Sequence, residues 1–358
     1  MPIPTPDEKQ LPQVSVKPIE WGQGFVRLLD QTRLPWEEIF LEIKTHQEVA
    51  VAIREMRVRG APAIGVTAAY GMVLAAASLK GVDRKATLDG MRAASRELAA
   101  SRPTAVNLRW ALERMMDAAE RVAPKDDMET SLLTEALIIH RETQKSDLRM
   151  GEFGAPLIQR GSTVLTHCNT GALATGGYGT ALGVIWRAWE DGRVKDVVAT
   201  ETRPWLQGAR LTTWELTRLD IPTTLIVDSA AGYLMSRGRI HCVIVGADRI
   251  ASNGDVANKI GTCSLAILAH ENGIPFYVAA PFSTVDMSIS SGDDIPIEER
   301  PGEEVTWIRE TQIALEGVPV LNLAFDVTPS RYVTAIITDR GVAEAPYQET
   351  LRRLMNDG

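Results

Sequence analysis

The sequence of 358 residues has few cysteines and no excess of positive charge. Its three cysteines are an odd number without paired metal-ligand spacing, which argues against disulfides and zinc and fits a reducing compartment. The formal net charge of −8 argues against nucleic acid as a partner, because a broad nucleic-acid surface needs a basic field. A small basic pocket for one phosphate is still compatible with that charge. The N-terminal stretch MPIPTPDEKQ lacks the hydrophobic core of a signal peptide, so we expect a cytoplasmic protein.

One long segment carries no charge. Ala61–Leu79 is nearly long enough to span a bilayer, but it is rich in alanine and glycine rather than leucine and isoleucine. Pro62 suits the first turn of a soluble helix. We therefore expect no membrane association and a helix buried between domains or subunits.

The apolar pattern divides the chain into two parts. Residues before about Pro18 are proline-rich and polar, and we expect a loose tail there. A long helical pattern over residues 129–151 would join the two parts. We predict a mostly helical N-terminal domain over residues 1–130 that carries a small antiparallel sheet, and a C-terminal α/β domain over residues 131–358.

From Gly161 onward, short apolar runs alternate with helical segments. Continuous β-branched runs of this kind are typical of strands buried on both faces. The alternation predicts a Rossmann-like, mainly parallel sheet with right-handed crossovers. The expected strands are Thr163–His167, Val197–Thr200, Thr223–Val227, His241–Val245, Phe276–Ala279 and Val333–Ile337.

Polar residues follow most of these strands. Because the carboxyl ends of parallel strands meet at one edge of a sheet, where open α/β sheets hold their ligands, we expect the chemistry at that edge. In chain order the residues are Cys168 and Asn169, then Glu201, Thr202 and Arg203, then Asp228, then Asp248 and Arg249, then Pro281 and Ser283.

The segment Ile244–Thr262 (IVGADRIASNGDVANKIGT) is the most informative in the chain. An apolar run ends at Gly246, and Asp248 follows at once. Asn253-Gly254 is a turn dipeptide, and Asp255 is a good N-cap. The pattern predicts a strand, a polar loop and a helix that begins at Asp255.

Asn258 and Lys259 would then lie in the first turn of that helix. The amides of a helix start favour phosphate, and Lys259 adds a full charge. An ordinary capped connection would explain the turn and the cap, but it would not explain why Asp248 and Lys259 flank the same loop. We interpret the loop as part of a site.

Cys168 comes at the end of a strand, before the glycine-rich loop Thr170–Gly179. A thiol there can act as a base or nucleophile if it is partly exposed near positive charge. A buried free cysteine is otherwise a small filler, which is our interpretation of Cys242 and Cys263. His167 precedes Cys168, but adjacent strand residues point to opposite faces, so we expect a structural role for it.

The glycine-rich loop is a poor match to a dinucleotide-binding fingerprint. Gly177, Gly179 and Gly183 give GxGxxxG, one residue too long, and the loop exceeds the tight turn of that motif. We therefore expect no nicotinamide cofactor. The histidines show no ligand spacing, and we expect no metal.

The segment Arg59–Pro62 precedes a helix. Glycine permits close approach of a ligand, the helix start offers amides, and arginine can bind phosphate with two hydrogen bonds. A solvated arginine at a helix entry is an equally good interpretation. Arg102 and Gln207 are weak signals on their own, because such residues are more often at the surface or in caps.

Five further segments, together with Ile244–Thr262, occur in the same order in one known family. They are Val58–Gly65 (VRGAPAIG), Ser101–Leu108 (SRPTAVNL), Thr166–Gly179 (THCNTGALATGGYG), Glu201–Thr212 (ETRPWLQGARLT) and Phe325–Pro329 (FDVTP). Together the six segments resemble the methylthioribose-1-phosphate isomerases. That family shares a superfamily with regulatory subunits of a translation-initiation exchange factor and with archaeal ribose-1,5-bisphosphate isomerases.

The resemblance implies an aldose–ketose isomerase of methionine salvage, which converts 5-methylthioribose 1-phosphate to 5-methylthioribulose 1-phosphate. It also implies a homodimer that needs no cofactor. It places catalytic roles on Cys168 and Asp248, and substrate contacts on Arg59, Gly60, Ala61, Arg102, Gln207, Asn258 and Lys259. Because Arg59 and Arg102 belong to the helical part, the site would lie between the two domains.

The implied chemistry needs an acid, because the esterified anomeric oxygen locks the sugar as a ring. We assign the acid to Asp248, whose pKa must rise well above its ordinary value of about 3.9. Cys168 either carries the C2 proton to C1 or stabilises charge while a hydride shifts from C2 to C1. The sequence leaves both routes open.

Two other functions fit the same fold. One is a non-catalytic regulatory subunit, against which Cys168, Asp248 and the complete set of substrate contacts argue. The other is a sister isomerase that acts on ribose 1,5-bisphosphate or 5-deoxyribose 1-phosphate. The sequence does not identify the pocket for the C5 substituent, so this alternative stays open.

Overall fold

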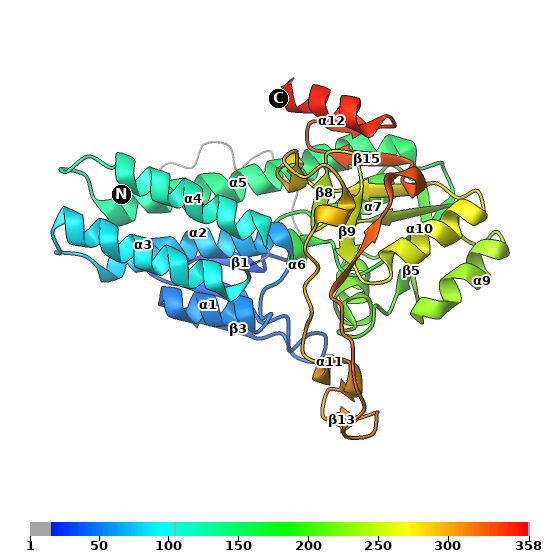
Figure 1. Cartoon of the computed structure of the whole chain (residues 1–358), viewed down its shortest axis with the longest axis horizontal. Helices are drawn as coiled ribbons and strands as arrows, with labels where there is room; N and C mark the ends of the chain where they lie inside the picture. The colour runs from blue at the N-terminus through cyan, green and yellow to red at the C-terminus, as the bar shows by residue number, and fades with distance from the viewer. Residues whose placement is uncertain (1–15, 104, 357–358) are drawn as a thin grey trace.

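The computed structural model describes residues 16–103 and 105–356 of the chain. The loose tail expected before Pro18 lies outside the described residues, apart from residues 16 and 17. Figure 1 shows a helical part on the left and a sheet with flanking helices on the right. This arrangement agrees with the predicted fold class.

The helical part is built around α2 (Ala61–Ser78). This helix is long and apolar enough to cross a membrane, but 78% of it is buried inside the protein, as expected for a core helix. Around it pack α1 (His46–Arg54), α3 (Arg84–Ser101) and α4 (Val106–Arg121). The small antiparallel sheet is β1 (Ile19–Trp21), β2 (Val26–Leu29) and β3 (Phe40–Ile43).

The long helix α5 (Met128–Gly154) contacts α2 and α4 at one end and α7 (Ala181–Glu190) of the sheet part at the other. It begins where the Asp127 carboxylate accepts a hydrogen bond from the Thr130 amide, which satisfies an otherwise unpaired donor of the first turn. Figure 1 shows it reaching between the two parts. The domain division near residue 130 stays a prediction.

The large sheet has seven strands in the order β16-β15-β10-β7-β4-β5-β6. Six are parallel, and β16 pairs with β15 antiparallel at one edge. Their bounds are β4 Ser162–Thr166, β5 Val194–Thr200, β6 Thr223–Ile226, β7 Cys242–Val245, β10 Phe276–Ala279, β15 Ala335–Thr338 and β16 Gly341–Ala343. The chain runs from β4 to β6 in one direction and then returns to β7 on the other side of β4. In open α/β sheets, ligands bind where the strand order reverses in this way.

Helices cover both faces of this sheet, as the continuous apolar strands require. On one face, α7 (Ala181–Glu190) and the end of α5 pack over the strands. On the other face lie α9 (Ala231–Ser236), α10 (Thr262–Glu271) and α12 (Tyr347–Asn356).

A second sheet of four strands corrects one prediction. Its order is β11-β8-β9-β14, with bounds Val285–Asp286, Arg249–Ala251, Val256–Lys259 and Phe325–Thr328. The helix expected to begin at Asp255 is wrong, because the following residues form β9, which pairs with β8 and β14. The Asp255 carboxylate accepts hydrogen bonds from the amides of Gly292 and Ser330 instead of capping a helix. The helix of this region, α10, begins only at Thr262.

A short arm projects from the sheet part at the bottom of Figure 1. It carries α11 (Glu303–Thr306) and a hairpin of β12 (Trp307–Ile308) and β13 (Thr311–Gln312). Several large apolar side chains of this region are exposed, and Leu315 and Leu321 are 87% and 71% exposed.

Candidate active site

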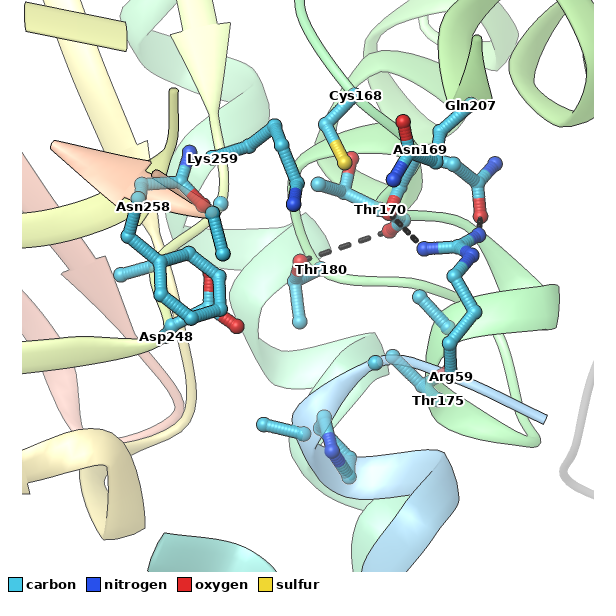
Figure 2. Close-up of a pocket in the computed structure, with 18 of the residues that line it drawn as sticks. Arg59, Cys168, Asn169, Thr170, Thr175, Thr180, Gln207, Asp248, Asn258 and Lys259 are labelled. Atoms are coloured by element: carbon cyan, nitrogen blue, oxygen red, sulfur yellow. Dashed lines mark hydrogen bonds between the residues drawn. The ribbon is translucent and has the colours of Figure 1, made fainter. Parts of the chain in front are cut away.

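A partly open cavity lies at the carboxyl edge of the large sheet. It is lined from both parts of the chain, by the start of α2 and by the loops that follow β4 and β7. All nine predicted site residues line it: Arg59, Gly60, Ala61, Arg102, Cys168, Gln207, Asp248, Asn258 and Lys259. Figure 2 labels six of these: Arg59, Cys168, Gln207, Asp248, Asn258 and Lys259. The structure therefore brings the predicted set together, whereas the role of each residue stays a proposal.

Cys168 follows β4 in a backbone conformation that is rare for a residue with a side chain, with φ of +63°. Two hydrogen bonds hold it there. Its amide donates to Thr202 Oγ1 at 2.9 Å, and its carbonyl accepts from Thr212 Oγ1 at 2.5 Å. Non-glycine residues in this region cost energy and cluster at functional sites.

The Cys168 thiol is 9% exposed, and its sulfur faces the cavity in Figure 2. Burial raises the pKa of this thiol, while the charges of Arg59 and Lys259 pull it back down. Near neutral pH the thiol therefore keeps its proton. His167 is not its base, because the two ring nitrogens bond to Thr200 Oγ1 at 2.6 Å and to the Ile260 carbonyl at 2.9 Å.

Asp248 follows β7, the strand that pairs with β4. Its amide donates to the Ala257 carbonyl at 2.9 Å, which fixes the loop against β9. Burial raises the pKa of the carboxyl, while Lys259 and Arg102 oppose the rise. The pKa of Asp248 is therefore shifted upward, which is the direction that a general acid needs.

Arg249 does not work against the raised pKa of Asp248. The guanidinium turns to Asp286 instead, with Nη1 3.9 Å from the carboxylate. Arg249, the one cation of β8, therefore points toward the neighbouring strand β11 and not into the cavity.

The start of α2 is the helix terminus that faces the cavity. Gly60 is its N-cap with φ of +96°, and among the described residues no side chain caps the first turn. A Cβ at Gly60 would lie 2.4 Å from the Ala174 carbonyl oxygen, so only glycine fits here. Gly60 and Ala61 line the cavity, which leaves the amides of this turn available to an anion.

The α10 terminus does not provide such a site, contrary to our expectation for this segment. The Asp326 carboxylate accepts hydrogen bonds from the Gly261 amide at 2.7 Å and the Cys263 amide at 3.1 Å. A carboxylate therefore already occupies the helix start. Lys259 still lines the cavity, but from strand β9, with its ammonium 4.9 Å from the centre of the Phe325 ring.

Three predicted substrate contacts carry buried polar atoms without a hydrogen-bond partner among the described residues. These atoms are Arg59 Nε, Arg102 Nε and Gln207 Oε1. Leaving a buried polar group unpaired costs about 1–3 kcal/mol, so such groups in a cavity wall indicate a polar ligand. The remaining Arg59 nitrogens bond to Asn169, with Nη1 donating to its carbonyl at 3.0 Å and Nη2 to its side-chain oxygen.

Sequence reasoning missed a group of charged residues at the same cavity. Arg300 lines it and donates to Glu298 Oε1 at 3.0 Å and to Glu304 Oε1 at 2.9 Å. Glu298 also accepts from Arg102 Nη2 at 3.0 Å. The run EERPGEE in which they occur is typical of a solvated surface loop, so it gave no signal. Among the described residues, no group of three or more His, Cys, Asp or Glu could hold a metal ion.

Comparisons with known proteins agree with this arrangement. Residues 57–345 match the sequence model of the Initiation factor 2 subunit family. The methylthioribose-1-phosphate isomerase of Pelotomaculum thermopropionicum is 56% identical over 334 residues, which cover 93% of this chain and 92% of that protein. The protein of the same name from Syntrophotalea carbinolica is 55% identical and covers 95% of this chain and 100% of its own length.

Two crystal structures are also similar to the chain. The 5-methylthioribose 1-phosphate isomerase from Pyrococcus horikoshii OT3 has a TM-score of 0.89 and 45% identity, covering 96% of both chains. The translation initiation factor eIF-2B, subunit delta, from A. fulgidus has a TM-score of 0.85 and 43% identity, covering 95% of this chain and 99% of that one.

Proposed function

This chain belongs to the Initiation factor 2 subunit family, and on that premise we propose that it is an aldose–ketose isomerase of methionine salvage. It converts 5-methylthioribose 1-phosphate to 5-methylthioribulose 1-phosphate. The observation that carries the proposal is the single cavity in which Cys168 and Asp248 meet a complete set of anion-binding groups. A purely regulatory binding surface would not need a thiol and a raised-pKa acid in one pocket.

The phosphate binds at the start of α2. The helix dipole and the uncapped first-turn amides of Gly60 and Ala61 favour an anion there. Arg59 supplies a buried positive charge beside them, and its unpaired Nε is free to donate. Lys259 adds positive charge from β9. Arg102 also lines the cavity; its Nη2 donates to Glu298, while its Nε has no partner among the described residues.

Asp248 donates a proton to the ring oxygen of the sugar. The C1–oxygen bond then breaks, and the ring oxygen becomes a hydroxyl. Because burial raises the pKa of Asp248, a larger fraction of the carboxyl is protonated than in an exposed aspartate at the same pH.

The hydrogen of C2 then moves to C1 as a hydride, and the C2 hydroxyl gives its proton to the Asp248 carboxylate as the ketone forms, which restores the acid. Cys168 stabilises the charge that develops during this shift. Its protonated state supports this route over proton abstraction, because a thiol that keeps its proton near neutral pH is a poor base.

The cavity also bears on which sugar is bound. A methylthio group needs apolar contacts, and the wall includes Met56, Pro62, Ala247, Pro281 and Phe325. A second phosphate at C5 would need further cations, but Arg300 is paired with Glu298 and Glu304. These contacts support a methylthio substituent over a second phosphate.

A substrate panel tests the proposal. We expect kcat/KM, followed by NMR detection of the ketose, to be highest for 5-methylthioribose 1-phosphate. A higher value for ribose 1,5-bisphosphate or 5-deoxyribose 1-phosphate would make the chain a sister isomerase. No turnover, with tight binding to a nucleotide-binding initiation factor, would make it a regulatory subunit.

We also propose a homodimer in the cytoplasm. The exposed side chains of Leu315 and Leu321 on the arm support burial against a second copy, since exposed apolar groups gathered in one place mark contact sites. Light scattering on the wild type and on Leu321→Glu tests this, with dissociation expected in the variant. The three free thiols fit a reducing compartment.

A further inference from the structure

We propose that Glu215 is a positioning residue for the isomerisation: it acts through Asn169 to fix where Arg59 and Cys168 lie. The inference rests on the proposed function for its meaning, but its geometry is independent of the substrate. Glu215 lies on α8 (Thr213–Arg218), behind the residues that line the cavity. Its side chain is almost completely buried, with 1% exposed.

The Glu215 carboxylate sets the orientation of the Asn169 amide. Asn169 Nδ2 donates to Glu215 Oε1 at 2.6 Å, and the Leu173 amide donates to Oε2 at 3.4 Å. An ionised carboxylate accepts hydrogen bonds and does not donate them, so in the ionised form of Glu215 the nitrogen of the Asn169 amide must face it. The amide oxygen must then face the other way.

The other side of the amide is Arg59. Its Nη2 donates to Asn169 Oδ1 and its Nη1 to the Asn169 carbonyl. If the Asn169 amide turned over, its oxygen would face the Glu215 carboxylate and its nitrogen would face the Arg59 guanidinium. Both contacts are unfavourable, because they would bring two acceptors together and two donors together in the protein interior. Glu215 therefore holds Arg59 in its place at the cavity wall without touching it.

The same hydrogen-bond network reaches the backbone of Cys168. Asn169 Nδ2 also donates to Thr212 Oγ1 at 3.2 Å, and this hydroxyl donates to the Cys168 carbonyl at 2.5 Å. Thr212 ends the π-helix η3 (Gly208–Thr212), directly before α8. The unusual backbone of Cys168 is thus tied to the element that carries Glu215.

The position of the Arg59 charge also affects the pKa of the Cys168 thiol. Burial raises the pKa of Glu215 to about 7, while the Asn169 hydrogen bond and Arg59 oppose the rise. Arg59 is the strongest of the neighbouring charges that lower the pKa of the Cys168 thiol. A displaced Arg59 would therefore leave that thiol with a higher pKa, a change that can be measured without any substrate.

The test compares Glu215→Gln, Asn169→Ala and the double variant. Glutamine keeps the shape of Glu215 but puts a donor against the Leu173 amide. We expect kcat/KM for 5-methylthioribose 1-phosphate to fall on the order of 100-fold in Glu215→Gln, as for a small misplacement of reacting groups. The double variant should be no slower than Asn169→Ala, since Glu215 acts through Asn169.

The decisive readout is alkylation of Cys168 by iodoacetamide as a function of pH, followed by mass spectrometry of its peptide. In Glu215→Gln the profile should shift to higher pH. Asp255→Asn is the matched control: its carboxyl also accepts backbone amides, but it does not line the cavity. It should lower the melting temperature and leave the alkylation profile unchanged.

An unchanged profile in folded Glu215→Gln, or additive losses in the double variant, would overturn the proposal. If Glu215→Gln does not fold, Asn169→Ala removes the side chain that accepts from Arg59 Nη2, and it should give the same shift. Wild-type protein without turnover would contradict the proposed function instead, because the alkylation shift does not depend on substrate.

Discussion

Cys168 and Asp248 follow β4 and β7, two strands that pair directly in the parallel sheet, with Val164 opposite Cys242. They are far apart in the chain, yet both line one cavity. The strand order reverses between these two strands, and loops that follow such strands diverge and leave a crevice. The topology therefore gives the thiol and the carboxyl a common space.

Replacing Cys168 by alanine should abolish most turnover and spare binding. We expect kcat to fall by at least on the order of 100-fold, since a positioned side chain at a reacting group contributes this much or more. The substrate Kd from calorimetry should change little, because the phosphate contacts remain. Cys263→Ala, a thiol outside the cavity, is the control and should keep kcat near wild type. Near-native kcat in Cys168→Ala would remove the thiol from the mechanism.

The raised pKa of Asp248 predicts that kcat falls on the alkaline side of its pH profile. Its pKa in the folded protein is raised, so the acid is present below that pKa and is lost as pH rises through it. We expect kcat of the wild type to fall as pH rises, and Asp248→Asn to lose nearly all turnover while the protein stays folded. An Asp248→Asn variant with substantial kcat and the same pH limb would assign the acid to another group.

Turnover in deuterated water separates the two routes to the ketose. Because burial raises the pKa of Cys168, we predict a hydride shift, and the product should carry little solvent deuterium at C1. NMR of product isolated at low conversion measures this. Substantial deuterium at C1 would show that Cys168 carries the proton through solvent-exchangeable positions.

The sequence predicted the parts of the site that follow buried strands. Cys168 and Asp248 each come within three residues of the end of an apolar run with β-branched residues, and such runs are visible without a structure. Gly60 was visible as a position that permits close approach. The sequence suggested a ligand there, and the structure shows that Ala174 also approaches this glycine closely.

The parts that could not be predicted depend on contacts between distant segments. Val256–Lys259 is too short to show a strand period, and only its pairing with β8 and β14 makes it a strand. Asp326 caps α10 from a different strand, so sequence spacing could not show that this helix start was already occupied. Glu215 lies in an ordinary helix, and nothing near it in the chain reveals its contact with Asn169.

Gly208 is a test of packing under the site. A Cβ there would lie 1.7 Å from the Thr200 carbonyl oxygen. This contact is too short, and the backbone would have to move to relieve it. We expect Gly208→Ala to lower the free energy of unfolding on the order of 3 kcal/mol, as overpacking in a rigid core does. Gly238→Ala is the control. It has φ of +64° and no described atom within 4 Å, so it should cost only about 1 kcal/mol. Equal losses in urea unfolding would contradict the close approach.

A crystal structure of the Asp248→Asn variant with 5-methylthioribose 1-phosphate tests the central claim most directly. We predict that the phosphate lies at the start of α2 beside Arg59, and that the sugar ring lies between the Cys168 sulfur and residue 248. A sugar bound outside this cavity, or one that contacts neither side chain, would contradict the account.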